Sequence, residues 1–217
     1  MDHLIKRFEA VEDGDLMLCE AHGVAYQRDM KIRVAYDSDY FDKCAGYEDQ
    51  AIARVINAGR IALVNKYVGA DAGVLDIGVG SGEFIKRRKN TFGYDINPAA
   101  IAWLKEIMRW TTSFVPFEAF TFWDVIEHVE EPGEYFRRIH DGGYLFASLP
   151  IFDDLTRIRE SKHYRPGEHL YYWTESGFVD WMALHGFKLL ERQDYETRAG
   201  RDSILSFAFQ RTADVSA

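Results

Sequence analysis

The feature that most constrains the fold is a glycine-rich turn between an apolar run and a helix-like run. Residues 73–77 read GVLDI, the turn continues as Gly78-Val79-Gly80-Ser81-Gly82, and a helix-like run covers 83–89. Glycine has no Cβ, so the main chain of such a turn can adopt positive φ and approach a ligand closely. The pattern therefore predicts a strand, a ligand-binding turn and a helix in this order.

Strand-like and helix-like runs alternate along the rest of the chain. Parallel strands need crossover connections, so the alternation predicts an α/β fold with a doubly wound, mostly parallel sheet of Rossmann-like type. Two final strands joined by a turn-rich segment predict a C-terminal antiparallel hairpin. The predicted strands are 73–77, 91–95, 119–124, 143–149, 187–195 and 203–211, and the predicted helices are 49–67 (broken or kinked at Gly59), 83–89, 98–109, 132–140 and 174–185.

The domain organisation is predicted to be simple. A chain of 217 residues with 47% hydrophobic residues is long enough for one well-buried core. We expect one main domain over residues 46–217. The part before it, residues 1–45, is predicted to be an N-terminal extension or small cap, with possible strands over 16–19 and 31–36.

Charge and cysteine content exclude several classes of protein. There are 26 Lys and Arg against 35 Asp and Glu, and a net charge of -9 disfavours binding to long nucleic acid. The two cysteines, Cys19 and Cys44, cannot form a disulfide framework, and Cys19-x-x-His22 with Cys44 offers too few ligands for structural zinc. The sequence shows no secretory leader and no apolar run of membrane-spanning length, so we expect a cytoplasmic protein without membrane contact.

Two acidic residues indicate which cofactor the turn accepts. Glu83 stands where a dinucleotide-binding pattern has its third glycine, and a carboxylate there repels a diphosphate but suits a cationic cofactor. Asp95 ends the next strand, where a carboxylate can accept both hydroxyls of an unphosphorylated ribose. A solvated strand-end or helix-capping aspartate is the alternative, and Asn97 could equally cap the following helix.

With these motifs in place, the sequence resembles the class I S-adenosylmethionine-dependent methyltransferases. The segments that carry the resemblance are 74–82 (VLDIGVGSG), 93–98 (GYDINP) and 122–129 (FWDVIEHV). The resemblance implies a seven-stranded Rossmann-like sheet with S-adenosylmethionine across the carboxyl ends of its first strands. It implies that Asp76 lies near the amino-acid part of the cofactor, that Gly78, Gly80 and Gly82 line it, that Asp95 holds the ribose and that Trp123 or Asp124 closes the methionine side.

One part of the family pattern is missing. The family usually has a further strand, ending in an acidic residue that contacts adenine, before the strand that ends at Trp123. Only residues 110–116 fill this space, and they contain no Asp or Glu. We therefore take Ile96, with an aromatic residue such as Trp110, as the candidates for adenine contact.

The loop after Trp123 is the predicted place of methyl transfer, because open α/β sheets bind their ligands at the carboxyl ends of strands. Glu127, His128 and the later His169 are the candidate catalytic residues, one of them acting as a general base. Supporting or helix-capping roles are the alternative for Glu127 and His128. The aromatic segment 163–173 is a candidate roof over the substrate.

A metal-dependent variant is also weighed. Asp124-x-x-Glu127-His128, with His163 or His169, is similar to the Glu-x-x-Glu-His metal site of some O-methyltransferases. The first ligand here is the shorter aspartate, and related enzymes with the Glu-His pair bind no metal, so we expect no metal site.

The sequence thus predicts an S-adenosylmethionine-dependent methyltransferase. The acceptor would be an O, N or C nucleophile of a small molecule or a small biopolymer fragment. A non-catalytic S-adenosylmethionine-binding sensor or regulatory protein is the alternative, followed by an NAD-dependent enzyme. The identity of the acceptor and the oligomeric state stay open.

Overall fold

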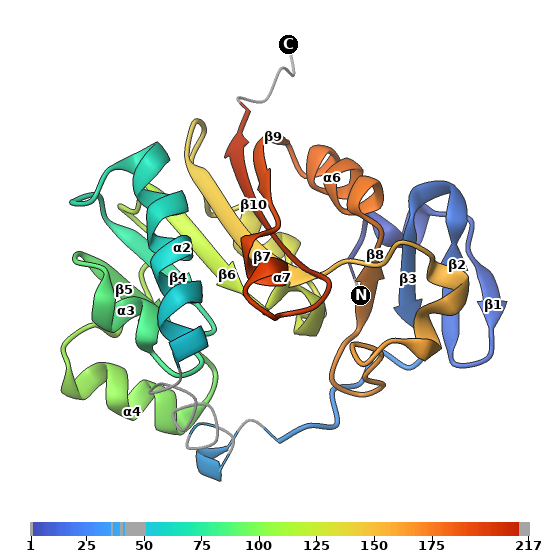
Figure 1. Cartoon of the computed structure of the whole chain (residues 1–217), viewed down its shortest axis with the longest axis horizontal. Coiled ribbons are helices and arrows are strands. Elements are labelled where there is room, and N and C mark those ends of the chain that lie inside the picture. Colours follow the sequence, from blue (N-terminus) through green and yellow to red (C-terminus); the bar gives the residue numbers. More distant parts are fainter. Residues whose placement is uncertain (1, 36, 40, 42–50, 213–217) are drawn as a thin grey trace.

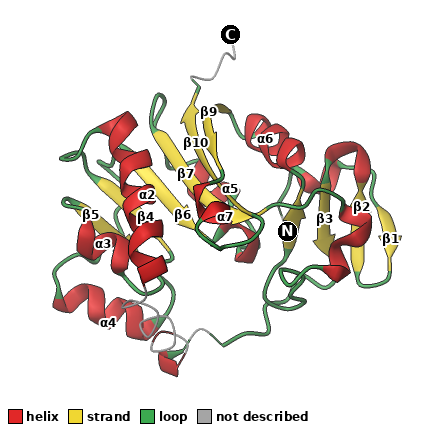
Figure 2. Cartoon of the chain, in the orientation of Figure 1, coloured by secondary structure: helices red, strands yellow, loops and turns green. Residues whose placement is uncertain are grey.

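The computed structural model describes residues 2–35, 37–39, 41 and 51–212, which form two sheets with surrounding helices (Figures 1 and 2). The larger sheet carries the predicted α/β fold. Its strands, in spatial order, are β5 (Thr91–Tyr94), β4 (Val74–Ile77), β6 (Ala119–Trp123), β7 (Tyr144–Pro150), β10 (Ile204–Arg211) and β9 (Phe187–Gln193).

The strand directions confirm the predicted Rossmann-like topology. β5, β4, β6 and β7 are parallel, and β10 pairs antiparallel with both β7 and β9. Side chains alternate across the sheet, as the two-residue period of a strand requires. In β6, Ala119 and Trp123 pack with Leu63 and Val64 of the long helix on one face, whereas Phe120 and Phe122 join the aromatic core on the other.

The described residues give this sheet six strands, and the seventh that the resemblance implies is not formed. Residues 110–116 lie at its place, and only Trp110 makes an isolated parallel bridge, to Gly93 of β5. The segment satisfies its polar groups locally instead: the Ser113 hydroxyl donates to the Val115 carbonyl, and the Thr111 hydroxyl accepts from Ser113 N. Such side-chain bonds to nearby backbone compete with a strand ladder.

The helices flank the larger sheet and connect its strands. They are α2 (Ala51–Val68), α3 (Glu83–Arg87), α4 (Pro98–Glu106), α5 (Gly133–Phe136), α6 (Glu175–Leu184) and α7 (Tyr195–Arg198). The predicted break at Gly59 was wrong, since α2 is continuous. Gly59 meets a packing need: a Cβ at this position would lie 2.3 Å from the ring of Tyr195. The predicted helix over 132–140 shrinks to the single turn of α5, and the predicted start of α2 at Asp49 lies outside the described residues.

The smaller sheet is antiparallel and mixes distant parts of the chain. Its order is β1 (Val11–Asp13), β2 (Leu16–Cys19), β3 (Val24–Gln27) and β8 (Tyr171–Trp173). The predicted strand 16–19 is confirmed, but residues 31–35 form no strand. The partner of β2 is β3, which follows it directly after the 3-10 turn Glu20–His22. The predicted domain boundary between residues 45 and 46 lies outside the described residues and stays a prediction.

β8 also corrects the prediction for residues 163–173. Tyr171, Tyr172 and Trp173 are wholly buried in the core and cannot roof a substrate. These three residues form a strand that pairs antiparallel with β3, so they are not part of a loop.

The carboxyl ends of β5, β4 and β6 meet at one edge of the larger sheet. In Figure 1 this edge is at the bottom, and the chain that leaves β3 crosses beneath it toward α4. The loops that follow these three strands carry most of the predicted site residues. None of the helices in the described ranges combines the length and apolar character that a membrane span requires.

Candidate cofactor and acceptor site

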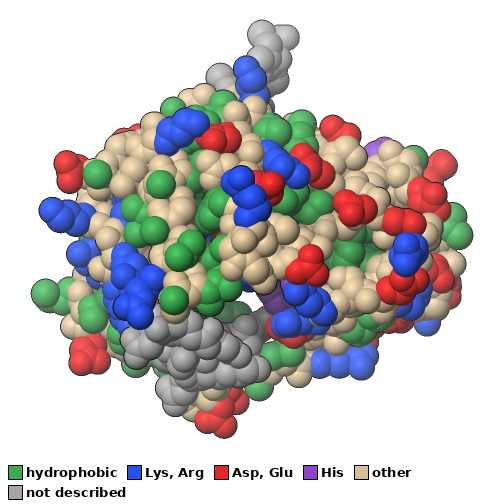
Figure 3. Space-filling model, in the orientation of Figure 1, with side chains coloured by type: hydrophobic (Ala, Val, Ile, Leu, Met, Phe, Trp, Pro, Cys, Tyr) green, Lys and Arg blue, Asp and Glu red, His purple; other side chains and the backbone are tan. Residues whose placement is uncertain are grey.

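A cavity of about 440 Å³ lies at the carboxyl edge of the larger sheet. It is lined by side chains of α2 and by the loops after β4, β5 and β6, and Figure 3 shows the molecule hollowed at this edge beside a histidine side chain. A second hollow, of about 700 Å³, lies at the opposite, amino ends of the strands, around Phe117 and Tyr144. It contains none of the predicted site residues, so the carboxyl-edge cavity is the candidate site.

The glycine turn contributes to the cavity unequally. Gly78, Gly80 and Gly82 all have positive φ, at 71°, 52° and 76°. A Cβ at Gly78 would lie 2.7 Å from Val125, and one at Gly82 would lie 2.2 Å from Trp103, but one at Gly80 would meet nothing within 4 Å. Gly80 therefore leaves room for a ligand, whereas the space at Gly78 and Gly82 is taken by the protein's own side chains. Gly78 and Gly80 line the cavity.

Asp76 forms part of the cavity wall beneath the turn. It pairs in register with Thr121 of β6, and the Thr121 hydroxyl donates a 2.6 Å hydrogen bond to its Oδ1. Burial raises the pKa of Asp76 to about 7, although the Thr121 hydrogen bond and the charge of Arg60 act in the opposite direction. Near neutral pH this carboxyl is therefore partly protonated, and a cationic ligand would favour its ionised form.

Asp95 is held firmly at the end of β5. Its Oδ2 accepts from Val79 N at 2.8 Å, which ties it to the glycine turn, and its Oδ1 accepts from Asn97 N at 2.8 Å. Asn97 caps α4, since its side chain accepts from Ala99 N, so Asp95 is not needed as a cap. Burial raises the pKa of Asp95 despite these amide donors. Both Asp95 and Ile96 line the cavity, and Ile96 is 64% exposed. Trp110, the other adenine candidate, does not line it.

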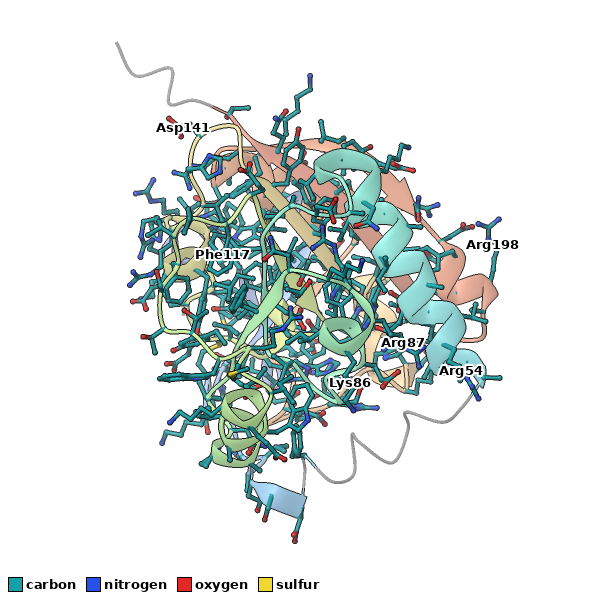
Figure 4. The ribbon with its side chains drawn as sticks, turned by 90° about the vertical axis from the view of Figure 1, so that its left-hand side faces the viewer. Arg54, Lys86, Arg87, Phe117, Asp141 and Arg198 are labelled. Atoms are coloured by element: carbon teal, nitrogen blue, oxygen red, sulfur yellow. The ribbon has the colours of Figure 1, made fainter. Side chains whose placement is uncertain are left out.

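The structure changes the argument made from Glu83. This residue lines the cavity but is salt-bridged within α3, with its Oε2 2.5 Å from Arg87 Nη2 and its Oε1 3.8 Å from Lys86 Nζ. α3 packs against α2, and Figure 4 shows Lys86 and Arg87 in the same lower part of the molecule as Arg54 of α2. The neighbouring cations offset the Glu83 charge, so this residue repels a diphosphate less than the sequence predicts.

Asp124 belongs to a charged network that the sequence did not reveal. Its Oδ2 accepts from Arg60 at 3.0 Å and from Arg201 at 2.9 Å, and its Oδ1 accepts from Arg201 at 2.9 Å. Both arginines also bond to Glu196, which is wholly buried. The two arginine charges hold the pKa of Asp124 far below its usual range, against the effect of burial. Arg60 is 136 residues from Glu196 in the sequence, so no local motif joins it to Glu196 and Arg201.

Trp123 lines the cavity beside this network, and Arg60, Asp124 and Arg201 of the network also line it. The Arg60 guanidinium lies 4.8 Å from the centre of the Trp123 ring, and Phe84 packs against the ring edge to face at 5.4 Å. Trp123 and Asp124 both line the cavity, as the resemblance implies. Asp124 is held by two arginines but keeps 27% of its side chain exposed, whereas Trp123 is 7% exposed.

The three candidate catalytic residues gather at the loop after β6, which carries Glu127 and His128. Ligand-type atoms of Glu127, His128 and His169 all lie within 4.8 Å of one another, and the two imidazoles meet edge to face at 4.6 Å. His128 lines the cavity, whereas Glu127 and His169 lie behind it, 1% and 4% exposed. Among the described residues, three buried atoms of this cluster lack a hydrogen-bond partner. They are both carboxylate oxygens of Glu127 and Nδ1 of His169.

Burial favours the uncharged form of all three groups. It raises the pKa of Glu127 well above the usual range, reinforced by the charge of Asp124. It lowers the pKa of His128 and lowers that of His169 to about 3. His128 Nδ1 lies 2.9 Å from the Glu168 carbonyl oxygen. A carbonyl can only accept, so Nδ1 carries the proton and Nε2 of neutral His128 is a proton acceptor.

The four-ligand metal arrangement weighed in the sequence is not assembled. Asp124 is held by the two arginines, and His163 Nε2 lies 2.8 Å from the Asp202 carbonyl and is not among the converging ligand atoms. Only Glu127, His128 and His169 converge. The donor set therefore does not fit the four-ligand site weighed from the sequence, and the absence of a metal stays a prediction. For the zinc alternative, Cys19 Sγ contacts His22 Nδ1 at 3.1 Å, and Cys44 lies outside the described residues.

The fold and the cavity together define a class of protein. A doubly wound sheet with its cavity across the ends of the first strands, a bare glycine and a strand-end carboxylate are typical of enzymes that bind a nucleoside cofactor.

Comparison with known proteins identifies the family. A family model described as a methyltransferase domain matches residues 53–192, and the chain belongs to this family. Its cofactor is S-adenosylmethionine, and it is an S-adenosylmethionine-dependent methyltransferase. The search of curated proteins found no match.

Several solved structures share the fold at low sequence identity. The 1,6-didemethyltoxoflavin-N1-methyltransferase of Burkholderia thailandensis is 16% identical, with a TM-score of 0.56 over 81% of this chain and 85% of that one. The N-methyltransferase NodS of Bradyrhizobium japonicum WM9 is 15% identical, with a TM-score of 0.54 over 81% and 98%. The magnesium protoporphyrin IX methyltransferase of Synechocystis PCC 6803 is 16% identical, with a TM-score of 0.53 over 80% and 94%. All three were solved with S-adenosylhomocysteine.

Proposed function

We propose that the enzyme methylates an O–H or N–H group of a small molecule, with His128 as the general base. The observation that carries the proposal is the fixed tautomer of His128, whose Nδ1 donates to the Glu168 carbonyl while the residue lines the cavity. In strand order, β4 lies between β5 and β6. Asp95 and Ile96 would therefore hold the adenosine on the β5 side, leaving the β6 side, with Val125 and His128, for the acceptor.

Proton and methyl transfer balance within this arrangement. The acceptor oxygen or nitrogen forms a bond to the methyl carbon, the carbon–sulfur bond breaks, and its electron pair returns to sulfur as S-adenosylhomocysteine forms. The acceptor proton passes to Nε2 of His128. The positive charge of the sulfonium disappears as an imidazolium appears, so the net charge of the buried site does not change. Little reorganisation of the surroundings is then required.

Glu127 and His169 support His128 in this proposal. Glu127 Oε1 lies 3.9 Å from His128 Nε2. When His128 accepts the proton, the new charge favours the ionised form of Glu127, so the two groups titrate as a pair. The edge of one imidazole against the face of the other fixes the orientation of both rings.

The direct test is a panel of acceptors incubated with S-adenosylmethionine, with S-adenosylhomocysteine measured as product. Phenols, alcohols and amines with an N–H are compared with tertiary amines and thioethers of similar size, which have no proton to lose. Turnover confined to the protic compounds supports the proposal. Turnover of tertiary amines or thioethers at equal rates contradicts it. Cofactor binding without turnover of any compound would favour the sensor alternative.

We expect Asp95 to be essential for cofactor affinity. In Asp95→Asn an amide N–H₂ replaces one of two oxygens that accept from Val79 N and Asn97 N, and one ribose acceptor is lost. Loss of one charge-assisted hydrogen bond to the ribose predicts binding of S-adenosylhomocysteine weaker by about ten- to a hundred-fold, measured by calorimetry. The exposed Asp153→Asn is the matched control and should bind as the wild type does. An Asp95→Asn protein with wild-type affinity would disprove the ribose assignment.

Cofactor binding should also depend on pH through Asp76. Its pKa of about 7 means that the carboxyl is mostly protonated below this pH, and a cationic cofactor favours the ionised form. Affinity for S-adenosylmethionine should therefore rise by up to about tenfold per pH unit between pH 5.5 and 7 and level off above. Calorimetry at pH 6 in buffers of different ionisation enthalpy should show proton release, which disappears in Asp76→Asn. Proton release that persists in Asp76→Asn would assign the titration to another group.

A further inference from the structure

The beginning of the chain is buried to an unusual degree. Asp2 and Ile5 are both 0% exposed. Asp2 Oδ1 accepts from Leu4 N at 2.9 Å and from Trp181 Nε1 at 3.3 Å, and Oδ2 lies 3.1 Å from His185 Nε2. Burial alone would raise the pKa of Asp2, but His185 and Trp181 lower it to about 2. The carboxylate is therefore charged and held inside the protein.

Asp2 is joined through Tyr171 to the two segments that carry the acceptor-side histidines. The Tyr171 hydroxyl accepts from Asp2 N at 2.8 Å and donates to the Glu130 carbonyl at 2.6 Å. Glu130 follows His128 by two residues, and Tyr171 follows His169 by two residues. The same hydroxyl thus fixes both segments relative to each other and to the N-terminus.

This contact is the outermost of three that connect the segments. The inner two are the hydrogen bond from Leu170 N to the Glu127 carbonyl, at 2.7 Å, and that from His128 Nδ1 to the Glu168 carbonyl, at 2.9 Å. The inner contacts define the tautomer of His128 and bring the ring of His169 against that of His128. The outer contact involves Asp2 through its main-chain N–H, which donates to the Tyr171 hydroxyl, and the side chain of Asp2 holds that N–H in place through Trp181 and His185.

The side chain of Asp2 is closely packed. Gly133 lies against it, and a Cβ at Gly133 would stand 2.9 Å from the His185 ring and 3.3 Å from Asp2 Oδ2. His3 N donates to Glu131 Oε1 at 3.0 Å on the outer side. The N-terminal segment is therefore packed against the chain that follows His128 by shape as well as by charge.

We propose that Asp2 is a positioning residue, which acts through Tyr171 to set the relative orientation of His128 and His169 at the acceptor end of the cavity. The inference deepens the proposed function, because it concerns the same two histidines, but its observable is the state of the imidazoles and not turnover. Asp2 and Tyr171 do not line the cavity. Their removal should change the histidines without weakening cofactor binding.

The test uses the full chain labelled with ¹⁵N-histidine and three variants: Asp2→Ala, Asp2→Asn and Tyr171→Phe. Ring-nitrogen spectra, assigned with His128→Gln and His169→Gln, report which nitrogen of each histidine carries the proton. We expect His128 to be the Nδ1–H tautomer in the wild type and a mixture of tautomers in Asp2→Ala and Tyr171→Phe. Asp2→Asn, which keeps an oxygen for Leu4 N, should lie between them. Affinity for S-adenosylhomocysteine should stay within about twofold throughout.

The controls separate positioning from general damage. Asp153→Ala removes an exposed acid and should match the wild type in both measurements. If Asp2→Ala does not fold, Tyr171→Phe decides, because it removes a single hydroxyl and keeps the ring in the core. Folded variants with wild-type histidine spectra would overturn the proposal, and so would a parallel loss of cofactor affinity. If the wild type methylates no acceptor, the proposed function fails while the spectra still decide this inference.

Discussion

Replacing His128 with glutamine is expected to slow methyl transfer by a factor on the order of 10² to 10⁴, the usual contribution of a general base. Glutamine retains an N–H that can donate toward the Glu168 carbonyl but offers no basic nitrogen to the acceptor. Affinity for S-adenosylhomocysteine should stay within about threefold, because Asp95 and Gly80 are unchanged. The measurement is the initial rate with a protic acceptor from the panel, together with calorimetry of the product.

The control for this variant is His140→Gln, an exposed histidine outside the cavity, which should retain the wild-type rate. The pH profile adds a second check. Since burial lowers the pKa of His128, the enzyme should lose activity on the acid side at a pH below the 6.5 of an ordinary histidine. A His128→Gln enzyme with an unchanged rate and profile would show that the acceptor loses its proton elsewhere.

Arg60→Ala is expected to destabilise the folded protein by about 3 to 5 kcal/mol, the usual cost of breaking a buried ion pair. Arg60 is 9% exposed and donates to Glu196, Asp124 and Ser148. Its removal leaves the wholly buried Glu196 with Arg201 as its remaining cationic partner. Chemical denaturation monitored by tryptophan fluorescence measures the change, and the exposed Arg157→Ala is the control, for which we expect no measurable shift.

A double variant distinguishes charge from packing in this network. Removing both partners avoids the uncompensated charge, so Arg60→Met with Glu196→Leu should recover much of the stability lost in Arg60→Ala. If the double variant is as unstable as the single one, the network contributes through its hydrogen bonds to Asp124 and Ser148 and not through the charge of Glu196.

The larger sheet was predictable because its signals are local. The parallel strands are short, mainly apolar runs bounded by turns, and Asn97 caps its helix as its sequence position indicates. The same holds for the residues around the glycine turn, where a single segment carries the strand, the bend and the helix start. Asp76, Gly80 and Asp95 line the cavity as the motifs led us to expect.

What the sequence could not show depends on distant partners. Arg60, Glu196 and Arg201 form one network across about 140 positions, and no spacing in the sequence announces it. Gly59 looked like a helix breaker because its partner, Tyr195, is equally remote. The strand Tyr171–Trp173 looked like an aromatic loop because its pairing partner lies near residue 25.

The pairing of β3 with β8 has a consequence for how the protein is made. On the ribosome, residues 24–26 emerge long before residues 171–173, so the smaller sheet lacks its fourth strand during most of synthesis. Until then β3 exposes an unpaired edge, which is a hazard for association with other nascent chains. Completion of this sheet should therefore be a late event, and a chain stopped before residue 171 should be prone to aggregate.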